Sequence, residues 1–352
     1  MPHHLFHIIA FLVSTNVVLL TTPIVKDIAL KSGRFDRPGD RKIHKQPMVR
    51  LGGVSIFLGA LTALLVVWGL GGFMNPNGDF LPQDKEFEIW GVTIGGLAFF
   101  LIGLADDLYG LSAIFRLIME VIVASFAWFV GVQIEFLSVP FDGLIQIGWL
   151  SLPVTVIWLV GMANAINMID GVDGLAAGVS GIAAVVMLFV SLFMNQPGAA
   201  LIAAALAGGA LGFLRYNFNP AQIFMGDGGA YYMGFTLAGV GVIGLVKTTA
   251  VTSLVLPYII LAVPILDMSA VILDRIRHGK SPFSADNRHL HHRLLKAGLS
   301  QRLTVLFIYS LTLWVGSLAL VFSGIPSGVI YASGATGLLV YTSWKVWRSK
   351  KC

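Results

Sequence analysis

Four polar side chains stand at regular spacing just after a long apolar segment. They are Asn164, Asn167, Asp170 and Asp173, in the stretch NAINMIDGVDGL, which closely follows LPVTVIWLVGM. The asparagines lie one helical turn apart, and the aspartates fall on the glycine-rich turn that comes next. Amide and carboxylate oxygens suit a hard cation such as Mg²⁺, which keeps several waters and bridges to phosphates. A polar turn with local side-chain to backbone hydrogen bonds explains one such residue more easily than four.

An acidic pair, Asp106 and Asp107, closes another apolar segment in GLADDLYG. Such a pair can simply cap a helix end where the chain meets water. However, acids at a helix C-terminus oppose the helix dipole, so the pair is costly unless a cation such as Arg116 offsets it. We therefore interpret the pair as functional.

Two further clusters could bind phosphate. In FMGDGG, the glycines beside Asp227 let the backbone approach an anion closely, and the following helix would offer free N–H groups, although GDGG alone is also typical of a turn. In SPFSADNRHLHHRLLKAG, Arg288, His289, His291 and His292 form a basic run. By itself such a run is a solvated basic surface; beside a phosphate site it would clamp a pyrophosphate. A zinc site fits less well, because the other clusters contain no cysteine.

The elements that position these clusters are predicted to be transmembrane helices. The chain is 56% hydrophobic and only 12% charged, about half the charge of a soluble domain. Apolar segments near the roughly 20 residues that cross a bilayer recur along its length. We predict a single domain over residues 1–352 with an all-α, polytopic fold and a retained first helix. The eleven predicted spans are centred in residues 5–25, 51–72, 88–105, 114–133, 150–166, 175–194, 199–216, 230–246, 250–273, 303–323 and 327–347.

Lysines and arginines indicate the orientation, because basic residues in short loops stay cytoplasmic. They concentrate in residues 31–50, in residues 275–302 and after residue 344, which eleven spans place on one face. The N-terminus is therefore expected outside and the C-terminus in the cytoplasm. This asymmetry also accounts for the net charge of +5 without nucleic acid binding. The single cysteine, Cys352, excludes an internal disulfide.

On this map all four polar clusters face the cytoplasm, as a single site would require. Together they resemble the polyprenyl-phosphate N-acetylhexosamine-1-phosphate transferases (glycosyltransferase family 4), which are related to phospho-N-acetylmuramoyl-pentapeptide transferase. The resemblance covers nearly the whole chain. It rests on DRPGDRKIHKQPMVRLGG, ADD, NAINMIDGVDGL, FMGDGG and SPFSADNRHLHHRLLKAG, in that order.

The resemblance implies a role for each matching position. Mg²⁺, or Mn²⁺ in its place, would be bound by Asp227 with help from Asn167. Gly171, Val172 and Asp173 would hold uracil, with Phe224 stacking on the ring. Asp106 or Asp107 would activate or orient the lipid phosphate, with Asp170 beside them. The remaining expected substrate-binding residues are Asn164, Arg116, Arg288, His289, His291, His292 and Lys45, although a topogenic basic loop explains Lys45 equally well.

The implied reaction moves a sugar 1-phosphate from a UDP-N-acetylhexosamine to undecaprenyl phosphate and releases UMP. The enzyme would lie in the plasma (inner) membrane among its lipids, with its active site facing the cytoplasm; a homodimer is left open. The stretch HLHHR departs from the three histidines followed by Glu of the peptidoglycan branch, which disfavours a peptide-bearing donor. We expect GlcNAc-1-phosphate to be the group transferred.

Two other classes of membrane protein fit the sequence less well. A CDP-alcohol phosphotransferase also uses acids and metal at this surface, but Leu175, Ala176, Ala177 and Gly178 follow Asp173-Gly174 in place of its longer signature. A transporter predicts mid-membrane polar residues and internal repeats, and no clear repeat is seen. We also expect an ion pair between Arg116 and Glu120, one turn apart. Asp267 and Asp274 share a helical face; Asp274 is expected either to be functional or to pair with Arg277.

Overall fold

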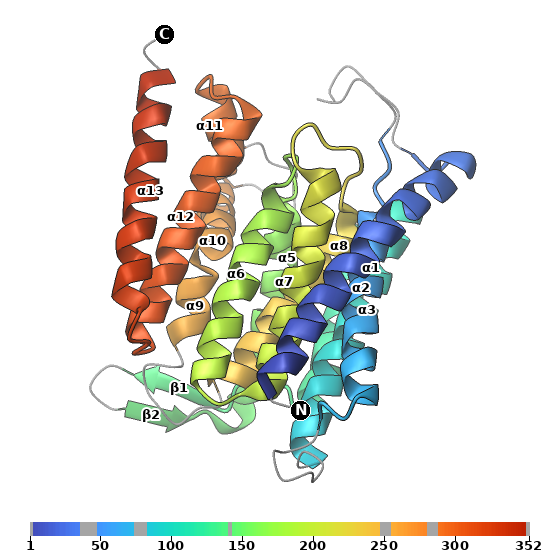
Figure 1. The fold of residues 1–352 in the computed structure, drawn as a ribbon, viewed down its shortest axis with the longest axis vertical. Helices are drawn as coiled ribbons and strands as arrows, with labels where there is room; N and C mark the ends of the chain where they lie inside the picture. Colours follow the sequence, from blue (N-terminus) through green and yellow to red (C-terminus); the bar gives the residue numbers. More distant parts are fainter. Residues whose placement is uncertain are drawn as a thin grey trace.

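The computed structural model describes residues 3–35, 48–73, 83–139, 143–246, 255–279 and 288–349, which form a helical bundle (Figure 1). Its first half contains α1 (His3–Lys31), α2 (Gly52–Gly69), α3 (Gln83–Tyr109), α4 (Ala113–Phe129), α5 (Ser151–Ile169), α6 (Leu175–Phe193) and α7 (Pro197–Asn217). Its second half contains α8 (Gly226–Val240), α9 (Leu256–Ile260), α10 (Ala262–Arg277), α11 (Leu290–Lys296), α12 (Gln301–Phe322) and α13 (Gly328–Ser349). The prediction of a helical, multi-pass membrane protein is confirmed.

Eight described helices are long and apolar enough to cross a membrane: α1, α2, α3, α5, α6, α7, α8 and α12. The three other predicted spans correspond to shorter, broken or less apolar helices. The helix α4 has 17 residues, and α13 carries Lys345 and Arg348 near its end. The span predicted over 250–273 is divided into α9 and α10 around Leu261. Pro264 explains this break, because it has no N–H to donate to the carbonyl of Ile260, where α9 ends.

A small hairpin is an addition to the predicted all-helical fold. Strands β1 (Phe136–Val139) and β2 (Gly143–Gln146) pair antiparallel, with Phe136 opposite Gln146. A short 3₁₀ turn, η1 (Gly148–Leu150), then leads into α5. The hairpin lies at the same end of the bundle as the N-terminus, whereas the C-terminus lies at the other end (Figure 1).

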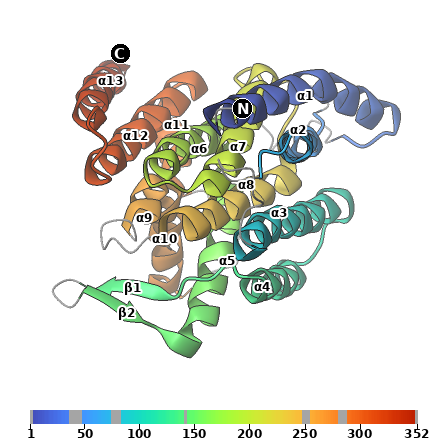
Figure 2. The same ribbon diagram turned by 60° about the horizontal axis from the view of Figure 1, so that its bottom comes forward.

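The helix α8 forms the centre of the bundle, surrounded by α2, α3, α5, α6 and α7 (Figure 2). All its residues are buried except Asp227, and it continues into a π-helical segment, η2 (Gly241–Val246). Glycines allow the close packing, since a Cβ on Gly53 of α2 would lie only 2.2 Å from the Gly229 nitrogen of α8. The outer surface is apolar, with Leu20, Phe129 and Ile157 each more than two-thirds exposed. The polar first turn of α8 is therefore held firmly inside an apolar shell.

Candidate active site

The acidic pair at the end of α3 contacts two different elements. Asp106 accepts a hydrogen bond from the Leu111 backbone N–H at 2.7 Å and forms an ion pair with Arg116 of α4. Asp107 accepts hydrogen bonds from the backbone N–H groups of Asp227 and Gly228, each at 3.0 Å. Asp107 therefore caps the positive N-terminal end of α8, where a carboxylate is most stabilising.

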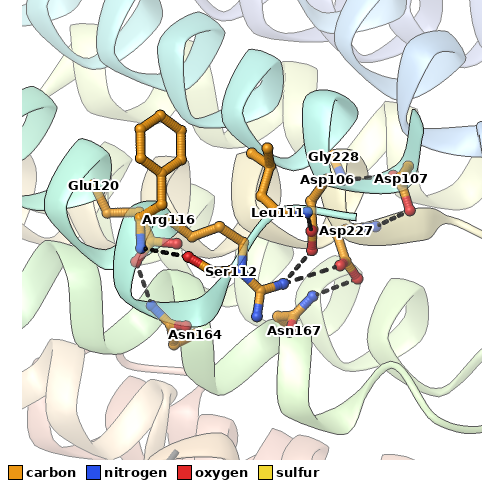
Figure 3. Close-up of polar contacts among 11 residues, drawn as sticks. Asp106, Asp107, Leu111, Ser112, Arg116, Glu120, Asn164, Asn167, Asp227 and Gly228 are labelled. Carbon is orange, nitrogen blue, oxygen red and sulfur yellow. Dashed lines mark hydrogen bonds and ion pairs between the residues drawn. The ribbon is translucent and has the colours of Figure 1, made fainter. Parts of the chain in front are cut away.

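Arg116 connects this pair to the GD motif. Besides Asp106, its guanidinium contacts Asp227 (Figure 3), with Nη1 at 3.5 Å from Oδ2. The other Asp227 oxygen accepts a hydrogen bond from Nδ2 of Asn167 at 2.9 Å. Three stretches that are far apart in the sequence, ADD, NxxN and GDGG, therefore meet at Asp227.

The predicted ion pair between Arg116 and Glu120 is wrong. The guanidinium extends to Asp106 and Asp227, while Oε2 of Glu120 accepts a hydrogen bond from Nδ2 of Asn164 at 2.6 Å. Glu120 is buried, and its Oε1 has no hydrogen-bond partner among the described residues. The two asparagines of NxxN thus extend the site along α5, each donating to a different carboxylate.

The turn between α5 and α6 contains the DGVDG motif, residues 170–174. Burial and the nearby Asp227 carboxylate raise the pKa of Asp170 from 3.8 to about 7. Oδ2 of Asp173 accepts hydrogen bonds from Nδ2 of Asn219 at 3.1 Å and from the Ala221 N–H at 3.0 Å. Val172 is buried and Gly171 is exposed. The carboxyl of Asp173 is thereby tied to the loop between α7 and α8.

That loop also contains Phe224, the predicted stacking residue. Its ring is partly buried, and its backbone is paired with the strand-like segment before α2. The Phe224 N–H donates to the Val49 carbonyl at 2.8 Å, and its carbonyl accepts from the Gly52 N–H at 3.0 Å. The Gly53 N–H similarly donates to the Met225 carbonyl at 2.8 Å. Sequence reasoning missed this pairing, because nothing in local spacing links residues so far apart.

The basic run packs against α10. Arg288 forms an ion pair with Asp274, which also lies 3.4 Å from Nδ1 of His278, so the alternative pairing with Arg277 is wrong. Nδ1 of His289 lies 2.9 Å from Oδ2 of Asp267. The ring centroids of His291 and His292 are 4.2 Å apart.

His291 links this run to the DGVDG turn. A Cβ on Gly171 would lie 2.7 Å from Nε2 of His291, so the ring rests directly against the turn. Burial, with the neighbouring His292 and His289, lowers the pKa of His291 from 6.5 to about 4. The structure therefore connects all the predicted clusters; Lys45 lies outside the described residues.

The donor set fits a hard cation. No group of three or more His, Cys, Asp or Glu side chains in the described ranges has the arrangement of a complete metal site. Asp227 and Asn167 nevertheless place a carboxylate and an amide within 2.9 Å of each other. The pKa of Asp170 is raised first by burial and then by the carboxylates of Asp227, Asp107 and Asp173, so negative charge is also crowded here. A cation would relieve this crowding, with oxygen ligands and water completing its coordination.

Comparison with known proteins agrees with these motifs. A family model described as glycosyl transferase family 4 matches residues 89–245. The chain is 40% identical over 304 residues to the "Probable undecaprenyl-phosphate N-acetylglucosaminyl 1-phosphate transferase" of Bacillus subtilis, covering 86% of this chain and 81% of that protein. This chain belongs to glycosyl transferase family 4.

Other relatives of this family 4 chain come from two further bacteria. It is 34% identical over 357 residues to a decaprenyl-phosphate N-acetylglucosaminephosphotransferase of Mycolicibacterium smegmatis, covering 94% of this chain and 84% of the relative. It is 26% identical over 298 residues to an undecaprenyl-phosphate alpha-N-acetylglucosaminyl 1-phosphate transferase of Salmonella typhi, covering 82% and 77%. The matched family region contains Asp106, Asn167 and Asp227, whereas the basic run lies after it.

Proposed function

We propose that this family 4 protein transfers N-acetylglucosamine 1-phosphate from UDP-N-acetylglucosamine to undecaprenyl phosphate. The observation that carries the proposal is the convergence of Asp107, Arg116 and Asn167 on the GD motif at Asp227. The names of the relatives support the transferred group and a polyprenyl phosphate acceptor. The product would be a lipid-diphospho-sugar that initiates a cell-envelope polysaccharide.

In the proposed reaction an oxygen of the lipid phosphate attacks the sugar-bearing phosphorus of the donor. A new P–O bond forms, the bridging P–O bond of the diphosphate breaks, and UMP leaves with that bonding pair. Two anions must approach each other, so charge neutralisation and alignment matter more than covalent help from the protein. We favour this direct attack over an aspartyl-phosphate intermediate; trapping such an intermediate would refute it.

The residues of the site divide this work. Arg116, already beside Asp106 and Asp227, supplies positive charge where the lipid phosphate would approach. Arg288 and the histidines of α11 would hold the diphosphate, and the DGVDG turn would hold uracil. Asn167 and Asp227 would hold Mg²⁺, or Mn²⁺, which when bound supplies Lewis-acid charge neutralisation of the phosphates.

We further propose eleven membrane crossings in the plasma membrane, with the site facing the cytoplasm. The termini lie at opposite ends of the bundle, as an odd number of crossings requires (Figure 1). The basic run lies against the DGVDG turn, since a Cβ on Gly171 would lie 2.7 Å from Nε2 of His291, and this agrees with the preference of basic residues for the cytoplasmic side.

The decisive experiment measures UMP release by the purified protein in detergent. Reactions would contain undecaprenyl phosphate and a panel of UDP-sugars, with Mg²⁺ or with EDTA. We expect release from UDP-N-acetylglucosamine that requires both lipid and Mg²⁺. No release from any UDP-sugar by folded protein would refute the proposal, and release of CMP from CDP-linked donors would replace it with the CDP-alcohol class.

A further inference from the structure

The helix α10 carries two acids that both contact the basic run. Asp267 and Asp274 are seven residues apart, which places them two turns apart on one side of the helix. Asp274 forms an ion pair with Arg288, and Asp267 contacts the next residue, His289. Both acids lie outside the four motifs, and Arg288 and His289 are consecutive in the chain. The start of the basic run is therefore fastened to α10 at two points.

The contact of Asp267 with His289 determines which ring nitrogen carries a proton. The two side chains are only 7% and 5% exposed. One oxygen of Asp267 accepts from the Leu290 backbone N–H at 2.7 Å, and the other faces Nδ1 of His289 at 2.9 Å. An ionised carboxylate only accepts hydrogen bonds, so Nδ1 must be the donor. Nε2 of His289 is thereby left as the nitrogen that can serve a substrate.

The orientation of His289 is passed on to the nucleotide end of the site. Its ring is stacked on that of His291, with centroids 5.8 Å apart and planes 5° from parallel. His291 in turn rests against Gly171, at the start of the predicted uracil-binding turn. A continuous path of packed groups runs from Asp267 through His289 and His291 to the DGVDG motif.

We propose that Asp267 and Asp274 are positioning residues of the transferase: Asp267 holds the His289 imidazole with Nδ1–H toward α10, and Asp274 orients the Arg288 guanidinium. This inference rests on the proposed function, because it assigns Arg288 and His289 to the diphosphate. Neither acid touches substrate; each acts through its partner. A displacement of about 1 Å in a positioning group can cost about 100-fold in rate, which is the effect available to such residues.

A double-mutant cycle tests the role of Asp267. Asp267→Asn keeps the shape but presents an NH₂ group or a weaker acceptor to Nδ1, so kcat/KM for UMP release should fall by about 10- to 100-fold. In a His289→Gln background the same substitution should cost less than about 3-fold, because the partner through which it acts is gone. Equal losses in both backgrounds would show an independent structural role and overturn the proposal. Asp27→Asn, an exposed acid of α1, is the matched control.

Nitrogen-15 NMR of histidine-labelled protein tests the contact without any turnover. The His289 signal, assigned by its loss in His289→Gln, should show the Nδ1-protonated form in the wild type and a different form in Asp267→Asn. An Nε2-only proton in the wild type would overturn the proposed contact. Absence of any transferase activity would instead overturn the proposed function and, with it, the catalytic role of both acids, while the NMR result would still decide the geometry.

The Asp274 half of the proposal has its own readout. Asp274→Asn should raise KM for the UDP-sugar about 10-fold with little change in kcat, since a misplaced Arg288 weakens binding of a diphosphate that both ground and transition states carry. Asp274→Glu should restore part of the loss. Arg277→Gln, an exposed neighbour at the end of the same helix, should leave both constants unchanged. An unchanged KM in Asp274→Asn would remove Asp274 from the set of positioning residues.

Discussion

Among the individual residues of the site, carboxylates outnumber the basic side chains that neutralise their charge. Arg116 neutralises Asp106 and approaches Asp227, whereas Asp107 is stabilised by backbone N–H groups at the start of α8. Burial and the neighbouring carboxylates, Asp227 first, raise the pKa of Asp170, and Arg50 offsets only part of this shift. A bound cation would therefore reduce the repulsion among these carboxylates.

The sequence predicted part of this arrangement. The helix dipole predicted a cation such as Arg116 beside the acidic pair, and the ion pair of Arg116 with Asp106 confirms this. Arg116 and Glu120 are one helical turn apart, and this spacing suggested an ion pair between them. That prediction was wrong, because Glu120 instead accepts a hydrogen bond from Asn164. Spacing along one helix reveals only which side chains could meet. It does not show that Asp227, distant in sequence, competes for the same guanidinium.

Replacing the carboxylate of Asp227 is expected to stop the reaction. Asp227→Asn removes the charge that the proposed cation needs and the acceptor that faces Arg116, so UMP release should fall by at least about 100-fold. The isosteric change should leave folding and membrane insertion intact, which size-exclusion chromatography in detergent would check. An active Asp227→Asn protein would exclude Asp227 from the proposed metal site.

Acid should destabilise the protein partly through His291. Its folded pKa of about 4 lies below the ordinary 6.5, so between pH 6.5 and 4 the unfolded chain binds more protons and the free energy of unfolding falls as pH is lowered. From this residue the loss should reach about 2 kcal/mol at pH 5. Thermal unfolding at pH 8 and 5 should show a smaller pH effect in His291→Gln than in the wild type or in His4→Gln, an exposed control. An equal pH effect in all three would contradict the shift.

At the scale of elements, close helix contacts hold the motifs at fixed distances. A Cβ on Gly103 of α3 would lie 2.5 Å from the Asp227 carbonyl of α8, so these two helices touch backbone to backbone. This contact brings the end of α3 to the start of α8 and allows Asp107 to cap it. The apolar segments of the sequence predicted the approximate positions of the long helices, because polar residues interrupt the sequence near the end of each span.

Other elements could not be predicted as well. Pro264 was the signal for the break between α9 and α10. A long apolar segment nevertheless predicts a single span unless the missing backbone N–H of the proline is taken into account. The hairpin of β1 and β2 was not predicted, because each strand has only four residues and the apolar segments were interpreted as membrane spans. No pattern in the local sequence predicted that the basic run contacts α10, because this contact depends on the tertiary path of the segment between α10 and α11.

A methyl group between α3 and α8 should disturb the site. Gly103→Ala should lower the free energy of unfolding by about 1 to 3 kcal/mol, because the backbone of α8 cannot yield as a side chain would. UMP release should fall with it as Asp107 loses its position. Gly161→Ala in α5 is the matched control, since a Cβ there meets nothing within 4 Å and alanine favours a helix. Equal stability of the two variants would show that α3 and α8 are less closely packed.

At the scale of the whole molecule, charge and hydrophobicity are arranged for a membrane. Large apolar side chains cover the outside of the bundle, while the described carboxylates of the site gather between helix ends. The central α8 is buried except at Asp227, in its polar first turn, and that turn lies beside the ends of α3 and α5. A soluble nucleotide and a membrane-bound lipid phosphate would then meet at that end, one from the water and one along the bundle surface.

The proposed orientation can be tested with the chain's single cysteine. Cys352 lies outside the described residues and follows α13, so eleven crossings place it in the cytoplasm. A membrane-impermeant maleimide should label it in inside-out vesicles and leave it unlabelled in right-side-out vesicles. Pro326→Cys in a Cys352→Ser background, in the turn between α12 and α13, should give the opposite pattern. Labelling of both positions from one side would show that α13 does not cross the membrane. The number of spans would then be even, and the basic residues near the end of α13 would not indicate its orientation.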